Sequence, residues 1–299
     1  MPLLCDPPLL VAGNLDVTHK PTNKPTIPLF PGYVLDLDGT VYLGDALLPG
    51  AKRAIETLRA AGSHIVFLSN KPLQTRADYA AKLTRLGIPT APTEVINSSW
   101  VLARWLQDEA PGAALFVIGE PPLLAELRAA GFRLTEQPGE IEFVIASFDR
   151  TFDYRKLQIA FDAVRAGARF IATNGDRYCP TPQGGLPDAA AVIGAIEGCT
   201  GKQIEVIVGK PSPITVRAIL DRLQLPAREC IIVGDRLETD VRMGQEAGMA
   251  TAVVLTGVTT PELWAASEIQ PDYVLCSLDE LLPVVSSQTI VSPEGSYLR

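Results

Sequence analysis

The stretch YVLDLDGTVY at residues 33–42 limits the possible folds more than any other part of the chain. Its first residues form a short apolar run, typical of a strand buried in a parallel sheet, and Gly39 is expected in the turn that ends it. Asp36 and Asp38 would then lie at the carboxyl end of this strand, where open α/β sheets bind ligands. Two carboxylates this close repel each other unless a cation lies between them or one carries a proton. The stretch therefore predicts a metal site, an acid–base pair, or both.

The same stretch also has a purely structural interpretation. In a D-x-D-G turn the aspartates can serve only to accept backbone hydrogen bonds, and short motifs of this kind occur by chance. Polar residues at the ends of other strands are needed to distinguish a structural turn from a reaction site.

The composition narrows the classes of partner. A chain of 299 residues favours two domains, and a hydrophobic content of 47% is enough for a full core. The net charge is −8, with 34 acidic against 26 basic residues, and no basic run reverses this locally. A surface that binds nucleic acid needs clustered positive charge, so we expect no nucleic-acid partner.

The cysteines, the chain start and the hydropathy bear on the cell compartment. The five cysteines are scattered without a C-x-x-C motif, so the sequence indicates neither a zinc site nor a disulfide framework, and reduced thiols are the simplest account. The first residues lack the basic region of a signal peptide, and no apolar stretch is long enough to span a bilayer. We therefore expect a cytoplasmic protein with no membrane partner.

The chain contains two histidines, His19 and His64. The first lies in a proline-rich leader and the second opens an expected strand. A mechanism of the Ser-His-Asp or Cys-His type would therefore lack a well-placed base, and we exclude this class.

Apolar strands separated by amphipathic helices run through most of the chain, which predicts an α/β fold with a doubly wound, Rossmann-like parallel sheet. After residue 112 the pattern restarts as a β-α-β-α-β unit, which we interpret as an inserted smaller α/β cap domain at 114–203. The catalytic core would comprise 30–113 and 204–299, and the proline-rich residues 1–29 would form a flexible leader. The expected strands are 33–35, 64–68, 94–96, 114–118, 143–146, 169–173, 204–208, 230–233, 252–255 and 273–275.

Polar residues follow the ends of four expected strands. They are, in chain order, Asp36, Asp38, Gly39 and Thr40; Ser69 and Asn70; Lys210 and Pro211; and Gly234, Asp235 and Asp240. In this order the four segments resemble the signature of the haloacid dehalogenase (HAD) superfamily of phosphohydrolases. The insertion between the second and third segments resembles the branch with a C2-type cap, which includes NagD-like and 4-nitrophenylphosphatase-like phosphatases. The similarity covers roughly residues 30 to 285.

These residue types suit phosphoryl transfer even without the resemblance. A phosphomonoester presents charged oxygens, so an anionic nucleophile needs help from a cation to approach it. Mg²⁺ prefers oxygen ligands and keeps several waters, which matches a site with a few carboxylates and no histidine. The hydroxyl and backbone N–H of Ser69 and the positive charge of Lys210 suit the transferring phosphoryl group.

The resemblance implies a role for each carboxylate. Asp36 is the expected nucleophile, which forms an aspartyl-phosphate, and its second oxygen binds Mg²⁺ together with Asp235 and the backbone carbonyl of Asp38. Asp240 is expected to support the metal site through water or another ligand. Asp38 is the expected acid and base, which protonates the leaving oxygen and then deprotonates the hydrolytic water.

The core residues expected to contact the phosphate or substrate are, by the same resemblance, Gly39, Thr40, Ser69, Asn70 and Lys210. In the inserted domain, Asn174 and Asp176 resemble the family's Thr-Asn-x-Asp stretch that faces the core, although a loop turn explains them nearly as well. One departure from the family pattern is Lys71, where many relatives have a second asparagine. This lysine would either add charge near the site or point to solvent.

The expected function is Mg²⁺-dependent hydrolysis of small phosphorylated metabolites such as sugar phosphates, phosphoglycolate and nucleoside monophosphates, with 4-nitrophenyl phosphate as an artificial substrate. The alternative is a module that accepts or senses a phosphate without turnover, because receiver domains hold an aspartyl-phosphate with similar residues. An acid–base partner two residues after the nucleophile and a large inserted domain favour the enzyme. Family analogy also implies a homodimer formed through the cap.

Overall fold

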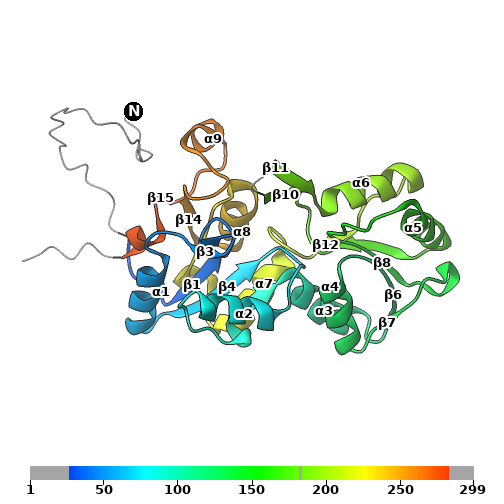
Figure 1. Ribbon diagram of the computed structural model, residues 1–299, viewed down its shortest axis with the longest axis horizontal. Coiled ribbons are helices and arrows are strands. Elements are labelled where there is room, and N and C mark those ends of the chain that lie inside the picture. Colours follow the sequence, from blue (N-terminus) through cyan, green and yellow to red (C-terminus); the bar gives the residue numbers. More distant parts are fainter. Residues whose placement is uncertain (1–26, 182–183, 283–299) are drawn as a thin grey trace, which may run out of the picture.

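The computed structural model describes residues 27–181 and 184–282, so most of the expected leader at 1–29 lies outside the described residues. The described chain forms two lobes, each built on a parallel sheet with helices packed against it (Figure 1). The larger lobe contains both ends of the described chain, and the smaller lobe comes from its middle. The protein is therefore an α/β structure with a Rossmann-like core and a separate cap sheet, as the sequence predicted.

The core sheet consists of six parallel strands. Because the chain extends the sheet from β1 in both directions, the strand order reverses beside β1, and ligands bind at the carboxyl ends of strands at such a reversal. In spatial order the strands are β15 (Tyr273–Leu275), β14 (Ala250–Val254), β13 (Cys230–Gly234), β1 (Gly32–Asp36), β4 (His64–Ser69) and β5 (Val95–Asn97).

Helices cover both faces of the core sheet (Figure 1). They are α1 (Ala51–Ala60), α2 (Arg76–Arg85), α3 (Ser98–Glu109), α7 (Pro213–Leu223) and α8 (Arg242–Ala247). A further helix of this lobe, α9 (Pro261–Ala266), packs through the partly buried Trp264. Successive β1 side chains point to opposite faces: Tyr33 and Leu35 pack with α1 and α2, whereas Val34 packs with α3, α7 and α8. Burial on both faces explains why β1 is a continuous apolar run rather than an alternating one.

The smaller lobe has a sheet of five parallel strands. In spatial order they are β12 (Val206–Ile207), β9 (Arg169–Ala172), β8 (Phe143–Ala146), β6 (Ala114–Ile118) and β7 (Arg133–Leu134). Its helices are α4 (Pro121–Ala129), α5 (Tyr154–Ala166) and α6 (Ala189–Thr200). Since β12 pairs with β9, this sheet includes residues beyond 203, and the cap boundaries at 114 and 203 stay a prediction.

Two hairpins and several short turns complete the described structure. The antiparallel hairpins are β2 (Tyr42–Leu43) with β3 (Ala46–Leu47), and β10 (Tyr178–Thr181) with β11 (Gly184–Pro187). The short turns are the 3₁₀ helices η1 (Pro92–Glu94), η2 (Pro138–Glu140), η3 (Ala227–Glu229) and η5 (Leu278–Leu281), and the π-helical turn η4 (Leu237–Val241).

One apolar cluster continues from the core into the smaller lobe. It joins Leu102 of α3 and Ile219 of α7 to Leu123 of α4 and to Leu115 and Ile171 of the smaller sheet. The two lobes are therefore connected by packed side chains as well as by the two chain crossings.

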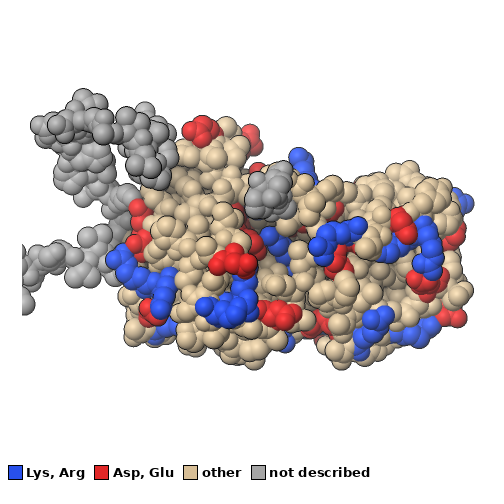
Figure 2. Space-filling view, viewed as in Figure 1, with Lys and Arg blue, Asp and Glu red and all other residues tan. Residues whose placement is uncertain are grey.

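Other expectations concern the whole surface and the cysteines. Across the described residues, none of the helices has the length and apolar character needed to cross a membrane. On the face drawn in Figure 2, lysine and arginine side chains are interspersed with acidic ones. Cys199 and Cys230 are free thiols, as expected for these two residues.

Candidate active site

A cavity of about 580 Å³ opens between the lobes, at the carboxyl ends of β1, β4 and β13. Its lining includes these residues expected from the sequence: Asp36, Asp38, Gly39, Ser69, Asn70, Asp176, Lys210 and Asp235. Three further expected residues, Thr40, Asn174 and Asp240, lie outside the lining. The four sequence segments therefore converge on one cavity, although they are far apart in the chain.

A buried charge cluster forms the floor of this cavity. The Lys210 ammonium lies 2.5 Å from Asp36 Oδ1 and 2.7 Å from Asp240 Oδ1, and all three side chains are almost inaccessible to solvent. Burial alone would lower the pKa of Lys210, but the carboxylates of Asp240 and Asp36 raise it overall. Lys210 is therefore a charged component of the cluster and not a surface lysine.

The cluster has more negative than positive charge. Burial raises the pKa of Asp36, against the opposing effect of Lys210, and the nearby carboxylates of Asp240 and Asp235 raise it further. Burial and then Asp240 also raise the pKa of Asp235. Three carboxylates thus face one ammonium, so a cation bound here would stabilise the ionised form of Asp36.

Asp235 is held against glycine backbone. Its Oδ2 accepts a hydrogen bond from the Val258 N–H at 2.7 Å. A Cβ atom added at Gly39 would lie 2.4 Å from Asp235 Oδ2, and one added at Gly257 would lie 2.0 Å from it. Gly39 also has φ +87°, a conformation that favours glycine. These glycines make room for a carboxylate at the carboxyl end of β13.

The donor set fits a magnesium ion. No three acidic, histidine or cysteine side chains between residues 27 and 282, leaving out 182 and 183, converge as a preformed metal cluster. Mg²⁺ does not need one, since it is usually bound by one or two carboxylates together with waters and substrate phosphate oxygens. Asp36 and Asp235 are buried carboxylates of the core that line the cavity and can supply these contacts.

Ser69 and Asn70 follow β4, as expected, but their side chains have different surroundings. Ser69 lines the cavity and donates to the Tyr79 hydroxyl at 3.3 Å. Asn70 Oδ1 accepts from the Lys210 N–H at 2.7 Å, and its Nδ2 donates to Asp176 Oδ2 at 2.9 Å. Asn70 thus fixes the backbone of Lys210 and links the core to the smaller lobe. Thr40 is buried, and its Oγ1 has no hydrogen-bond partner within the described part of the chain.

The smaller lobe contributes Asp176, directly supported by Asn174. Asn174 is fully buried, and its Nδ2 donates to Asp176 Oδ2 at 2.9 Å and to Asp188 Oδ1 at 3.1 Å. Asp176 Oδ1 lies 3.6 Å from the guanidinium of Arg236 in the core. Asp176 therefore bridges the lobes, while Asn174 holds it in place.

Sequence reasoning left one cavity residue undecided and missed several others. Lys71 points into the cavity, with its ammonium 3.1 Å from Asp38 Oδ1. Burial would lower the pKa of Lys71, but Asp38 and Cys179 together outweigh that effect, and the pKa lies above its usual value. The missed lining residues include Leu43, Tyr178, Cys179, Asp188 and Arg236. Arg236 had a sequence signal, because it directly follows Asp235, and Leu43 lies in a turn-rich stretch after the first motif.

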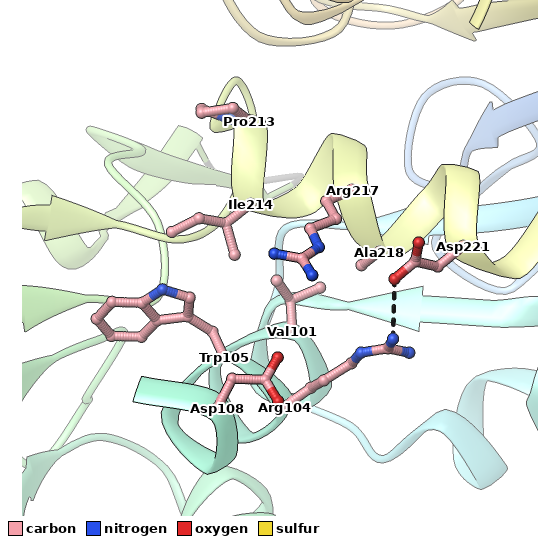
Figure 3. Close-up of a pocket in the computed structure, with 9 residues that line it drawn as sticks. All are labelled: Val101, Arg104, Trp105, Asp108, Pro213, Ile214, Arg217, Ala218 and Asp221. Atoms are coloured by element: carbon pink, nitrogen blue, oxygen red, sulfur yellow. Dashed lines mark hydrogen bonds and ion pairs between the residues drawn. The ribbon is translucent and has the colours of Figure 1, made fainter. Parts of the chain in front are cut away.

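A second cavity, of about 260 Å³, lies between α3 and α7 (Figure 3). Val101 and Ile214 give it an apolar floor, and Trp105 stands at one side. Arg104 and Asp221 form an ion pair of 2.9 Å at its edge. No residue of the four polar sequence segments lines it, so the reaction site belongs to the larger cavity.

Known proteins resemble the chain over most of its length. Residues 33–133 match the family model described as haloacid dehalogenase-like hydrolase, and residues 207–281 match one described as HAD-hydrolase-like. The sugar-phosphatase AraL of Bacillus subtilis is 39% identical over 260 residues, which cover 87% of this chain and 95% of the relative.

Two solved structures share both fold and sequence with it. A 4-nitrophenylphosphatase from Thermotoga maritima superposes with a TM-score of 0.81 at 36% identity, covering 84% of this chain and 96% of that one. NagD from Escherichia coli K-12 superposes with a TM-score of 0.77 at 31% identity, covering 85% and 98% respectively. The chain therefore belongs to the haloacid dehalogenase-like hydrolases, in the branch of the NagD-type and 4-nitrophenylphosphatase-type phosphatases.

Proposed function

We propose that the protein is a Mg²⁺-dependent phosphomonoesterase that hydrolyses small phosphorylated metabolites through an aspartyl-phosphate intermediate. The observation that supports this most is the buried cluster of Asp36, Lys210 and Asp240 beside Asp235, at the floor of a cavity between the lobes. The cavity volume of about 580 Å³ is in the range typical of small-molecule sites. The phosphatase names of the similar proteins support the same reaction class.

In the first chemical step, a carboxylate oxygen of Asp36 attacks phosphorus. The Asp36–phosphorus bond forms, the ester P–O bond breaks, and the leaving oxygen takes a proton from Asp38. Lys210, already 2.5 Å from Asp36 Oδ1, would neutralise negative charge on the transferring group. The N–H of Ser69 would donate a hydrogen bond to one oxygen of this group, and the Ser69 hydroxyl would do the same after turning away from Tyr79.

In the second step, water attacks phosphorus while Asp38 takes its proton, and inorganic phosphate and free Asp36 are released. Bound Mg²⁺ would supply the positive charge that lets an anionic carboxylate approach an anionic ester. Asp36, Asp235 and the backbone carbonyl of Asp38 would hold it. Asp240 would act indirectly, since its Oδ1 is 2.7 Å from the Lys210 ammonium.

Sugar phosphates are the substrates we favour, because the curated relative quoted above is named a sugar-phosphatase. Phosphoglycolate, glycerol phosphates, nucleoside monophosphates and pyridoxal phosphate are the other candidates. Two half-exposed apolar side chains lie at the cavity rim: Tyr178 of the smaller lobe and Leu43 of the core hairpin. They would contact the leaving group of the substrate. We also propose that the protein is cytoplasmic. Residues 114–203 would form the cap, and a homodimer would form through it.

The deciding experiment is turnover of 4-nitrophenyl phosphate and of a phosphometabolite panel by the purified protein. We expect many turnovers per protein with Mg²⁺, no activity in excess EDTA, and no phosphoenzyme in the Asp36→Asn variant. Stoichiometric phosphorylation without release of phosphate would favour the phosphoacceptor alternative. Hydrolysis at an unchanged rate in EDTA, or by Asp36→Asn, would show that the proposed mechanism is wrong.

A further inference from the structure

Lys71 is held more firmly than an ordinary lysine in a loop. Its backbone N–H donates to Ser69 Oγ at 3.2 Å, and its carbonyl accepts from the Tyr79 hydroxyl at 3.1 Å. Ser69 in turn donates to the same hydroxyl at 3.3 Å, which closes a ring of three hydrogen bonds. Tyr79 lies in α2 and is buried, so the start of the Lys71 side chain is anchored to the core.

The ammonium at the other end of this side chain meets the expected acid and base. Lys71 Nζ lies 3.1 Å from Asp38 Oδ1. In the ranges that the structure describes, no other side chain makes an ion pair or hydrogen bond with the Asp38 carboxylate. Cys179, which lies in β10 of the smaller lobe, lines the same cavity and also raises the pKa of Lys71. Lys71 therefore connects Asp38 of the core to the hairpin that covers the cavity.

We propose that Lys71 is a positioning residue, which holds the Asp38 carboxyl group in the orientation needed for proton transfer to and from the substrate. This inference rests on the proposed role of Asp38. An acid must lie within hydrogen-bond reach of the leaving oxygen, and a small displacement costs a large part of the rate. A carboxyl group at a strand end has freedom to rotate, and Lys71 is the contact that restricts it.

A purely stabilising ion pair is a weaker explanation. The Lys71 and Asp38 side chains are 23% and 29% exposed, and pairs with this much solvent contact contribute little to stability. The double anchoring of the Lys71 backbone places the ammonium beside one carboxylate oxygen inside a reaction cavity. A fixed contact of this kind keeps a catalytic acid in the orientation that its reaction needs.

The test compares Lys71→Met with a matched lysine variant outside the cavity. Lys156 pairs with Asp149 at 2.5 Å in the smaller lobe, and its side chain is also 23% exposed, so Lys156→Met is the control. We measure single-turnover phosphoenzyme formation with glycerol 3-phosphate, whose alkoxide leaves poorly, and with 4-nitrophenyl phosphate. Lys71→Met should slow the first by about 10- to 100-fold and the second much less, since only the first needs the acid. Its KM should change by less than about twofold, and Lys156→Met should match the unmodified protein.

A second background separates positioning from direct substrate contact. In Asp38→Asn, the group that Lys71 positions is no longer an acid, so adding Lys71→Met should change the first step by less than about twofold. Lys71→Arg should recover part of the rate lost in Lys71→Met, because it restores the cation. The proposal would be overturned if the double variant lost the product of the two single-variant rate reductions. A raised KM in Lys71→Met with an unchanged first-step rate would also overturn it.

The outcomes also distinguish this inference from the proposed function. If the unmodified protein does not hydrolyse 4-nitrophenyl phosphate, the proposed function itself is wrong. If it does, and Lys71→Met forms the phosphoenzyme from glycerol 3-phosphate at the unmodified rate, only the role of Lys71 is refuted. Melting temperatures of all variants, measured alongside, exclude loss of folded protein as the cause of a slow first step.

Discussion

Asp36 and Asp38 are two residues apart, yet their surroundings differ. Asp36 is buried against Lys210 beneath the cavity, whereas Asp38 is partly exposed in the cavity wall and contacts Lys71. A nucleophile benefits from a fixed cation and excluded water, while an acid has to reach the leaving group. The side-chain environments thus support two different roles for neighbouring carboxylates.

At the same scale, Gly257 should prove essential for the position of Asp235. An alanine Cβ would lie 2.0 Å from Asp235 Oδ2, so Gly257→Ala has to displace the carboxylate proposed to bind Mg²⁺. We expect the Mg²⁺ concentration for half-maximal activity to rise by about 10- to 100-fold, the usual cost of disturbing a metal ligand's support. A magnesium titration of 4-nitrophenyl phosphate hydrolysis measures this.

Gly194→Ala is the control for that experiment. Gly194 is exposed in α6, and an added Cβ would meet no atom within 4 Å. This variant should keep the magnesium dependence and gain about 0.5–1 kcal/mol in stability, because alanine favours helix. An unchanged magnesium titration in Gly257→Ala would contradict the proposed metal site.

Residue types at strand ends could be predicted from the sequence, but their partners could not. Asp36 and Asp235 follow apolar runs in β1 and β13, and parallel strands bring their carboxyl ends to one edge of the core sheet. Lys210 also follows an apolar run, but its strand β12 belongs to the smaller sheet, so its contact with Asp36 depends on how the two lobes pack. The direction of the Asn70 amide toward Lys210 and Asp176 depends on atoms more than 100 residues away in the chain. The contact between Lys71 and Asp38 likewise depends on the direction of two side chains in the folded protein. The pattern of apolar residues in the sequence does not predict such directions.

At the scale of elements, buried apolar strands were predictable and short pairings were not. The expected strands are all present, with ends shifted by at most two residues. The two-residue strand β7 carries too few residues for a pattern. The glycines and prolines in the segment of β10 and β11 are typical of a loop, yet this segment forms a hairpin. A two-stranded ribbon consists only of edges, which tolerate such residues.

One helix cap in the smaller lobe offers a test of element stability. Asp153 precedes α5, and its carboxylate accepts from the Lys156 N–H at 2.8 Å. Asp153→Ala removes this partner from the first turn and should lower the free energy of unfolding by about 1 kcal/mol. Asp153→Asn is the matched control, since asparagine caps helices as well as aspartate does.

Urea denaturation followed by circular dichroism measures both variants. Asp153 lies far along the chain from every proposed catalytic residue, so the first-step rate with 4-nitrophenyl phosphate should not change in either. Equal stabilities of Asp153→Ala and the unmodified protein would show that the hydrogen bond contributes nothing to α5.

At the scale of the whole molecule, Asp176 joins the lobes across the cavity. It contacts Asn70 at 2.9 Å and lies 3.6 Å from Arg236 of the core. Asp176→Ala removes both contacts, so the smaller lobe should spend more time away from the core. We expect a raised KM for sugar phosphates and faster hydrogen exchange in β10 and β11.

Glu136→Ala is the control for this variant, because its ion pair with Arg155 lies within the smaller lobe. It should leave both KM and hydrogen exchange near the cavity unchanged. If Asp176→Ala behaves like Glu136→Ala, the contacts across the cavity do not hold the lobes together.

The apolar cluster that runs from α3 and α7 into α4 has a consequence for protein engineering. The smaller lobe shares this apolar cluster with the core, so its inward side chains are buried only while the core is present. Expressing the smaller lobe alone would expose Leu123 and Ile171 to water. Chimeras that exchange whole caps between relatives would have to carry the inward faces of α3 and α7 with the cap. Heating should likewise melt both lobes in one cooperative transition, with the shared cluster as the common fold determinant.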